Sequence, residues 1–220
     1  FFFKQKTAYE IRNCDWSSDV CSSDLGTALF ASAPQVVMHN DVEHPFRQDS
    51  NFYYLTGFNE PQSVALLAPH HEEHRFILFV RPKDPEKETW SGYRVGVDQA
   101  KERYGADQVY PIGELDQYLP KYLEKADRLY YHFGHNQGLN QRVLHHWQTL
   151  LSTYHRRGTG PVAIEDAGLL MQTLRRIKDS TELEHLRRAI AISAQAHNQA
   201  RAMAAPGRYE YEIQIGRAHV

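Results

Sequence analysis

Short apolar runs bounded by turn residues alternate with helical patterns along residues 26–160 and predict an α/β domain. Strands are indicated where apolar or aromatic residues cluster and then stop at Gly, Pro or polar turn residues. The predicted strands are Thr27–Ala33, Phe52–Leu55, Ser63–Ala68, Arg75–Val80 and Leu129–Tyr131. The polar stretch 69–74 between the third and the fourth of these runs favours a β-hairpin.

Helices are predicted where apolar residues recur at helical spacing. These segments are Val97–Tyr104, Glu114–Lys125 and Asn140–Tyr154. In the second, Leu115, Leu119 and Leu123 fall at i, i+4 and i+8, which places them on one face.

A basic, Gly- and Pro-containing stretch, Arg156–Pro161, follows and predicts a linker. Beyond it the pattern is helical over Ala167–Ile177 and again over Thr181–Ala204, with Ser180 as the predicted N-cap of the second helix. The second helix carries an apolar face, and Pro206 with Gly207 ends it. We therefore expect an α/β domain followed by the opening helices of a second domain.

The composition narrows the function classes. With 41% hydrophobic and 24% charged residues among 220, the chain has the composition of a soluble globular protein. A net charge of -2 predicts no nucleic acid and no anionic membrane as partner. No apolar run approaches the roughly 20 residues that a membrane span needs.

The amino-acid patterns at both ends of the chain differ from the pattern of the rest. The runs K-Q-K-T-A-Y-E-I and D-W-S-S-D-V-C-S-S-D-L in residues 1–25, and I-G-R-A-H-V in 214–220, resemble the conceptual translation of a sequencing adapter. We interpret 1–25 and 214–220 as adapter-derived and leave them out of the fold. The only cysteines, Cys14 and Cys21, belong to the first of these segments and are expected to be unpaired. A core without cysteine fits a reducing cytoplasm, the predicted location.

Histidines gather at two places. The run H-H-E-E-H at 70–74 is the densest set of potential metal ligands, but a solvated hairpin loop explains it without a metal. His145 and His146 are adjacent on a predicted helix, so they face different directions and do not readily share a metal. We expect neither group to be a metal site.

The run Asp166-Ala167-Gly168 matches the opening of a dinuclear peptidase metal sequence, D-A-G. A helical pattern follows it here, and no D-x-T-R with a second ligand appears, so we interpret this match as a coincidence. No G-x-S-x-G, P-loop or dinucleotide fingerprint is present either.

Three local patterns carry a family resemblance. Residues 44–61, H-P-F-R-Q-D-S-N-F-Y-Y-L-T-G-F-N-E-P, resemble the Y-R-Q-x-S-x-F-x-Y-x-T-G-F-x-E-P signature of the aminopeptidase P N-terminal domain. Residues 90–96, W-S-G-Y-R-V-G, are similar to the W-x-G-x-R-x-G of that family. Residues 174–189, beginning L-R-R-I-K-D, resemble the entry into its "pita-bread" catalytic domain. The three patterns occur in the order that the family has them.

The resemblance implies a mixed β-sheet flanked by helices, as in the aminopeptidase P and creatinase N-terminal domains. It places that domain at 26–157 and makes 158–213 the linker and the first helices of a truncated pita-bread domain. It also implies that the intact protein is a metallopeptidase, a hydrolase that removes the residue preceding proline.

The resemblance further implies two Mn²⁺ ions in the full-length enzyme, bound by two Asp, one His and two Glu beyond this chain. We therefore expect no metal and no catalytic residue in the chain itself, and no activity. The implied partners are peptides with proline at the second position and further copies of the enzyme in a homo-oligomer.

The site residues predicted for the chain are Arg47, Trp90 and Arg94, as substrate or subunit contacts. Arg47 and Gln48 stand before an aromatic run, where they could bind a carboxylate or form a structural hydrogen-bond hub. Trp90 and Arg94 lie on a Gly-containing segment that we expect to be exposed, and these residue types often anchor interfaces. Two alternatives stay open: a prolidase, and a non-catalytic peptidase-like protein that acts through protein–protein contacts.

Overall fold

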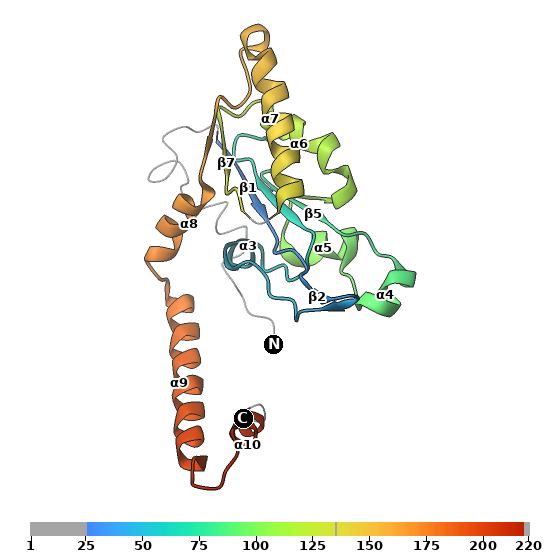
Figure 1. Cartoon of the computed structure of the whole chain (residues 1–220). Helices are drawn as coiled ribbons and strands as arrows, with labels where there is room; N and C mark the ends of the chain where they lie inside the picture. The colour runs from blue at the N-terminus through green and yellow to red at the C-terminus, as the bar shows by residue number, and fades with distance from the viewer. Residues whose placement is uncertain (1–25, 135, 218–220) are drawn as a thin grey trace. The chain divides into compact units, whose positions relative to one another are not determined.

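A computed structural model of the chain describes residues 26–134 and 136–217, and side chains up to residue 213 (Figure 1). The chain forms two compact units that divide between Leu174 and Arg175. The segment interpreted as adapter-derived at 1–25, with Cys14 and Cys21, lies outside the described residues, so that interpretation stays a prediction.

The first unit is built on one mixed sheet, which holds six strands in the described part of the chain. The strand order is β6-β5-β4-β1-β7-β8. Their bounds are β1 Thr27–Ala31, β4 Val64–Leu67, β5 Phe76–Val80, β6 Gln108–Pro111, β7 Arg128–Tyr131 and β8 Ala163–Glu165. The pairs β1–β4 and β4–β5 are antiparallel, while β5–β6, β1–β7 and β7–β8 are parallel. The predicted fold class and the predicted hairpin are thereby confirmed.

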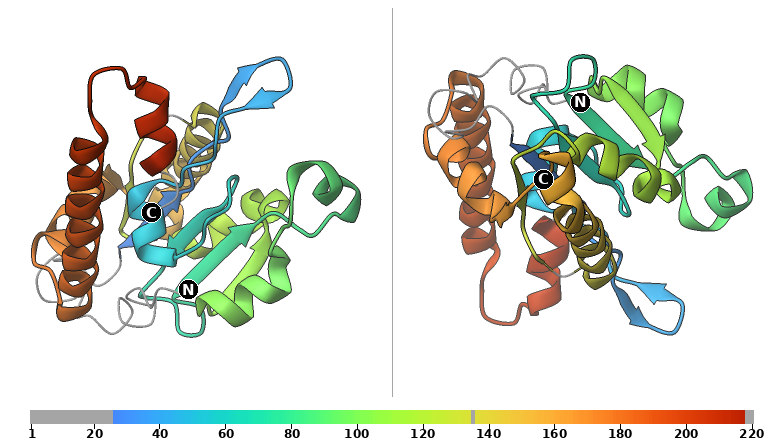
Figure 2. Two further views of the ribbon diagram at one scale, coloured as in Figure 1. Left: turned by 90° about the horizontal axis from the view of Figure 1, so that it is seen from below. Right: turned by 90° about the horizontal axis from the view of Figure 1, so that it is seen from above.

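Helices cover both faces of this sheet, and Figures 1 and 2 show them on its two sides. On one face, α3 (Ser50–Thr56), α5 (Gly96–Tyr104) and α8 (Ala167–Arg176) pack in a cluster that includes Phe30 and Leu78. On the other face, α6 (Leu115–Leu123) and α7 (Gln137–Arg157) pack against Leu29 and Ile77. Because successive strand residues point to opposite faces, each central strand supplies both clusters.

The predicted strand at Phe52–Leu55 is wrong, because these residues lie in helix α3. The Asp49 carboxylate accepts hydrogen bonds from the backbone N–H groups of Asn51 and Phe52 and caps the helix start. Gly57 ends the helix in the left-handed conformation, with φ of 66°. Phe52, Leu55 and Thr56 are buried on one face, as a helix requires.

Several short elements were not predicted from the sequence. They are β2 Val37–His39 and β3 Val42–Glu43, which pair as a separate ribbon, α4 Pro85–Ser91, β6, the 3₁₀ turn Ile112–Glu114, β8 and α10 Glu210–Arg217. Each is short or lacks a sustained apolar period, so the hydrophobic pattern gives little signal for it.

The end of the first unit lies further along the chain than the predicted boundary at 157/158. Strand β8 pairs with β7, and Leu170 and Met171 of α8 are buried in the core of the first unit. The predicted linker Arg156–Pro161 connects α7 to β8, and the Trp147 indole N–H donates a hydrogen bond of 2.9 Å to the Pro161 carbonyl. The stretch therefore joins two elements of one compact unit.

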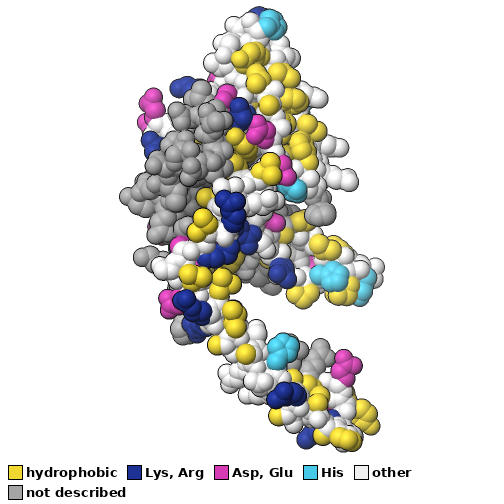
Figure 3. Space-filling model, turned by 90° about the vertical axis from the view of Figure 1, so that its left-hand side faces the viewer, with side chains coloured by type: hydrophobic (Ala, Val, Ile, Leu, Met, Phe, Trp, Pro, Cys, Tyr) yellow, Lys and Arg dark blue, Asp and Glu magenta, His cyan; other side chains and the backbone are white. Residues whose placement is uncertain are grey.

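The second unit consists of α9 (Ser180–Met203) and α10. Asp179, rather than the predicted Ser180, is the N-cap of α9, since its side chain and that of Glu182 form a reciprocal capping box. No described residue of α9 is buried, and Ile190 is 65% exposed. At the level of α9, Figure 3 shows apolar side chains interspersed with Lys and Arg at the surface. In the part of the chain that the structure describes, no helix is long and apolar enough to cross a bilayer.

Candidate functional site

The first motif, residues 44–61, folds around the buried side chain of Gln48, which is 8% exposed. The Gln48 Oε1 atom accepts hydrogen bonds from the backbone N–H groups of Ala33 (2.8 Å) and Asp49 (2.9 Å). Its Nε2 atom donates to the carbonyls of Phe58 (3.1 Å) and Glu60 (3.0 Å). The amide thus uses its full hydrogen-bonding capacity to join the chain after β1 to both ends of α3.

Glu60 extends this network to the second motif, residues 90–96. Its carboxylate is buried and accepts a hydrogen bond of 2.7 Å from the backbone N–H of Val95. The other carboxylate oxygen lies 3.4 Å from the Arg81 guanidinium, and both of these side chains are largely buried. The two motifs are therefore connected through Gln48 and Glu60, which we call the Gln48–Glu60 hub.

Trp90 and Arg94 lie on the segment that this hub holds. Trp90 is in the last turn of α4 and is 91% exposed. Residues 90–93 are exposed as predicted, whereas Arg94 is half-buried and Val95 and Gly96 are buried. The Arg94 guanidinium donates a 3.3 Å hydrogen bond to the Ser91 hydroxyl, while its buried Nε has no hydrogen-bond partner in the structure. The segment ends at Gly96, which has φ of +72°, and a Cβ there would lie 2.6 Å from Cγ of Lys83. Glycine is required at this position on both grounds.

Arg47 lies elsewhere. Its side chain is exposed and belongs to the rim of a cleft that neither Trp90 nor Arg94 lines. The three predicted contact residues are therefore not gathered in one pocket. Of the pair Arg47 and Gln48, it is Gln48 that forms the structural hydrogen-bond hub.

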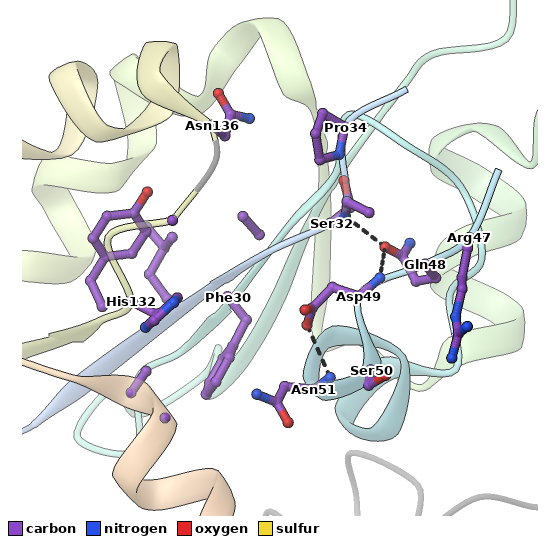
Figure 4. Close-up of a pocket in the computed structure, with 17 residues that line it drawn as sticks. Phe30, Ser32, Pro34, Arg47, Gln48, Asp49, Ser50, Asn51, His132 and Asn136 are labelled. Carbon is purple, nitrogen blue, oxygen red and sulfur yellow. Dashed lines mark hydrogen bonds between the residues drawn. The ribbon is translucent and has the colours of Figure 1, made fainter. Parts of the chain in front are cut away.

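The cleft itself has a volume of about 470 Å³ and opens at the carboxyl ends of β1 and β7 (Figure 4). Its polar lining includes Asp49, Asn51, His132 and Asn136. His132 follows β7, and its Nδ1 atom lies 2.9 Å from Oδ1 of Asp166, which follows β8. Sequence reasoning missed His132, because nothing local marks it and only the sheet brings it to this edge.

Asp166 has a structural role in this arrangement. Its carboxylate accepts a hydrogen bond from the Gly168 N–H, and this bond, followed by the one with His132, lowers the Asp166 pKa. The D-A-G run thus begins helix α8, as expected from the helical pattern after it.

The two histidine groups make protein contacts. His71 and His74 stack with ring centroids 5.4 Å apart, and Nδ1 of His74 lies 3.1 Å from the Tyr122 hydroxyl. His146 and Arg142 of α7 both donate to Asp116 of α6 at 2.9 Å. Within residues 26–134 and 136–213, no three His, Cys, Asp or Glu side chains are placed to hold a metal ion.

A mixed sheet covered by helices, with a buried polar hub that holds a segment bearing an exposed tryptophan, defines this unit as an α/β domain. The family model for the aminopeptidase P N-terminal domain matches residues 9–131, more than half of the chain. The chain belongs to this family. The match begins inside the segment interpreted as adapter-derived, so the extent of that segment still has to be tested on the encoding nucleotides.

The curated relatives include two bacterial proteins named Xaa-Pro aminopeptidase. The Xaa-Pro aminopeptidase of Haemophilus influenzae is 36% identical over 182 residues, which are 82% of this chain and 40% of that protein. The Xaa-Pro aminopeptidase of Escherichia coli is 34% identical over 188 residues, 85% of this chain and 43% of that protein. The chain thus spans less than half the length of these relatives.

Solved structures show the same fold. Pseudomonas aeruginosa aminopeptidase PepP matches with a TM-score of 0.85 and 34% identity, over 96% of this chain and 47% of that one. The low-pH form of E. coli aminopeptidase P matches with a TM-score of 0.86 and 30% identity, over 100% of this chain and 49% of that one. The α/β fold and the family predicted from the motifs are confirmed.

Proposed function

We propose that this chain is part of an Xaa-Pro aminopeptidase, a hydrolase that releases the N-terminal residue of a peptide when proline follows it. The observation that carries the proposal is the identity of 34–36% with two Xaa-Pro aminopeptidases over more than four-fifths of the chain. The alternatives are a prolidase and a peptidase-like protein without catalysis. The names of the two relatives favour the aminopeptidase.

The chain's own residues do not fit a dinuclear metal centre. Such a centre needs several carboxylates and a histidine that converge on one point. The Asp166 carboxylate instead caps α8 and pairs with His132, and no third ligand joins them among the described residues. We propose that the two metal ions of the whole enzyme, expected to be Mn²⁺, are bound by residues outside this chain, and that the chain alone is inactive.

The proposed contribution of the chain is contact with a peptide substrate or a neighbouring subunit through Trp90, Arg94 and Arg47. An indole that is 91% exposed leaves a large apolar area in water unless a partner covers it. The Gln48–Glu60 hub holds the backbone at Val95, in the same motif as Trp90, and so anchors the C-terminal end of the segment that carries the ring. We further propose that the whole protein is a homo-oligomer located in the cytoplasm.

Two measurements test this assignment. The 220-residue chain should show no turnover of Arg-Pro-Pro and no binding of two Mn²⁺ by calorimetric titration. The reading frame beyond Ile213 should contain D-A-G at the end of an apolar strand, followed by D-x-T-R. Turnover by the chain above a metal blank would refute the proposed inactivity of the chain, and a downstream frame without these ligands would refute the metallopeptidase assignment.

A further inference from the structure

The turn between β4 and β5, residues 69–75, packs its histidines against the last turn of helix α6. The ring centroid of His71 lies 5.1 Å from that of Tyr122, a residue of α6 that is 3% exposed. The His71 ring also stacks on the ring of His74, with centroids 5.4 Å apart, and Nδ1 of His74 lies 3.1 Å from the Tyr122 hydroxyl. These contacts hold the end of the β4–β5 hairpin against α6.

The surroundings of His70, in the same turn, favour the neutral form of its ring. The side chain is half-buried, and its Nδ1 atom is buried without a hydrogen-bond partner among the residues that the structure describes. A neutral imidazole can leave Nδ1 without a proton, whereas an imidazolium carries a proton on both ring nitrogens. Protonation in the closed turn would therefore place a charged N–H group at a buried position without an acceptor, which costs free energy.

The groups near His70 shift its pKa in both directions, and the net shift is downward. The charged and titratable groups of the turn and of the chain packed against it are His71, Glu72, Glu73, His74, Arg75, Tyr122, Lys125 and Asp127. Burial is the largest influence and lowers the His70 pKa below its ordinary value of 6.5. The charges of His71 and Lys125 lower it further, whereas the Tyr122 backbone and the charge of Asp127 raise it.

Acid should therefore favour an open form of this turn. In the open form the His70 ring is in water and has its ordinary pKa of 6.5, which is higher than the pKa in the closed form. Because the open form binds the proton more tightly, the closed form loses stability as the pH falls from 6.5 toward the lowered pKa. Above pH 6.5 the ring is neutral in both forms, and the contacts with Tyr122 are kept.

We propose that residues 69–75 form an acid-sensitive latch, which is closed over Tyr122 while His70 is neutral and opens when the His70 ring takes up a proton. Opening breaks the hydrogen bond between His74 and Tyr122 and separates the His71 ring from α6. Strands β4 and β5 stay paired, because their residues are buried in the sheet and lie outside the turn. The latch uses only the hairpin and the end of α6, so it does not depend on the proposed peptidase function.

Nuclear magnetic resonance of the 220-residue chain tests the latch in two ways. A titration of the ring protons should give His70 a pKa below 6.5. Amide exchange should report the opening at His71 and His74, whose N–H groups are hydrogen-bonded within the turn. We expect their protection factors, which are corrected for the intrinsic effect of pH, to fall at least about threefold between pH 7.5 and pH 5.5. The amide of Leu78, in the middle of β5, should keep its protection.

Two matched variants assign the effect to His70. His70→Gln keeps a polar side chain but does not titrate, so protection at His71 and His74 should be the same at both pH values. His155→Gln, at an exposed position of α7, is the control and should keep the pH dependence of the parent. The ratio between the two pH values is compared within each variant, so a loosening of the turn that is equal at both values cancels.

Three results would overturn the latch. The first is a His70 ring that titrates at 6.5 or above in the folded chain. The second is a parent chain whose protection in the turn does not change between the two pH values. The third is a His70→Gln chain with the same pH dependence as the parent.

Discussion

The first two of the three motifs that carry the family resemblance, residues 44–61 and 90–96, differ in how far their side chains are buried. In residues 44–61 the side chains of Gln48 and Glu60 are buried and hydrogen-bonded to the backbone of other segments. In residues 90–96 the largest side chain, Trp90, is 91% exposed. The comparison indicates that the first motif stabilises the domain, whereas the second is held in place for a contact with something else.

Substitution of Gln48 should have the largest effect on stability. Gln48→Ala leaves two backbone N–H groups and two carbonyls without their partner, and each buried unsatisfied group costs about 1–3 kcal/mol. We expect the free energy of unfolding to fall by about 3 kcal/mol or more, measured by urea denaturation. Gln35→Ala, which loses one exposed hydrogen bond to the His44 carbonyl, is the control and should change it by less than about 0.5 kcal/mol. Equal effects of the two substitutions would show that Gln48 is not a hub.

Substitution of Glu60 should have the second-largest effect on the free energy of unfolding. Glu60→Ala removes the acceptor for the Val95 N–H and leaves Arg81 without its partner, so we expect a loss of about 2 kcal/mol. Glu60→Gln keeps an acceptor oxygen and should lose roughly half as much. Hydrogen exchange at the Val95 amide checks the mechanism, because it should speed up in Glu60→Ala and change little in Glu60→Gln. If exchange is the same in both variants, Glu60 does not hold the second motif.

Substitution of Trp90 should affect activity rather than stability, the opposite of Gln48 and Glu60. Because the ring is exposed, Trp90→Ala should change the free energy of unfolding of the chain by less than about 0.5 kcal/mol. In the whole enzyme we expect the same substitution to lower kcat/KM by an amount equivalent to about 1–3 kcal/mol, the value of a well-packed contact. Tyr93→Ala, at a neighbouring residue that is 57% exposed, serves as the comparison variant. A loss of stability without a loss of activity would make Trp90 an ordinary packing residue.

The ion cluster on the surface of α6 and α7 should have the smallest effect. The hydrogen bond from Arg142, and with it the one from His146, lowers the pKa of Asp116 below its ordinary value of 3.8. Its contribution is therefore present above that value and is lost as the pH falls through the lowered pKa. The carboxylate is 53% exposed, so Asp116→Asn should cost only about 0.5 kcal/mol at pH 7. The difference between variant and parent should shrink as the pH falls below 3.8, and a difference that does not change with pH would rule out a charge effect.

The sequence alone predicted the buried strands and the long helices well, because their apolar periods are sustained. The aromatic run Phe52–Leu55 was assigned wrongly, since the capping carboxylate of Asp49 outweighs the strand preference of aromatic residues. In short segments, a residue that can cap a helix start, such as Asp49, therefore has to be considered before the strand or helix preferences of the residues that follow it.

The candidate sites were predictable only in part. The exposure of Trp90 was inferred from the absence of strand alternation around it, and the structure confirms that exposure. The connection of Gln48 to Val95 through Glu60 could not be predicted, because it depends on how α3 and α4 are placed relative to each other. His132 and Asp49 meet at one cleft only because β7 and β1 are neighbours in the sheet.

The most direct measurement is the activity of a chimera. Residues 26–213 of this chain would replace the matching N-terminal part of the E. coli Xaa-Pro aminopeptidase, and kcat/KM would be measured with Mn²⁺ on Arg-Pro-Pro and on Arg-Ala-Pro. We expect the chimera to cleave Arg-Pro-Pro, to leave Arg-Ala-Pro intact, and to lose activity on Trp90→Ala while its thermal midpoint is kept. A folded chimera that is inactive on Arg-Pro-Pro, or one that is indifferent to Trp90→Ala, would contradict the proposal that this domain serves an Xaa-Pro aminopeptidase through its exposed motif.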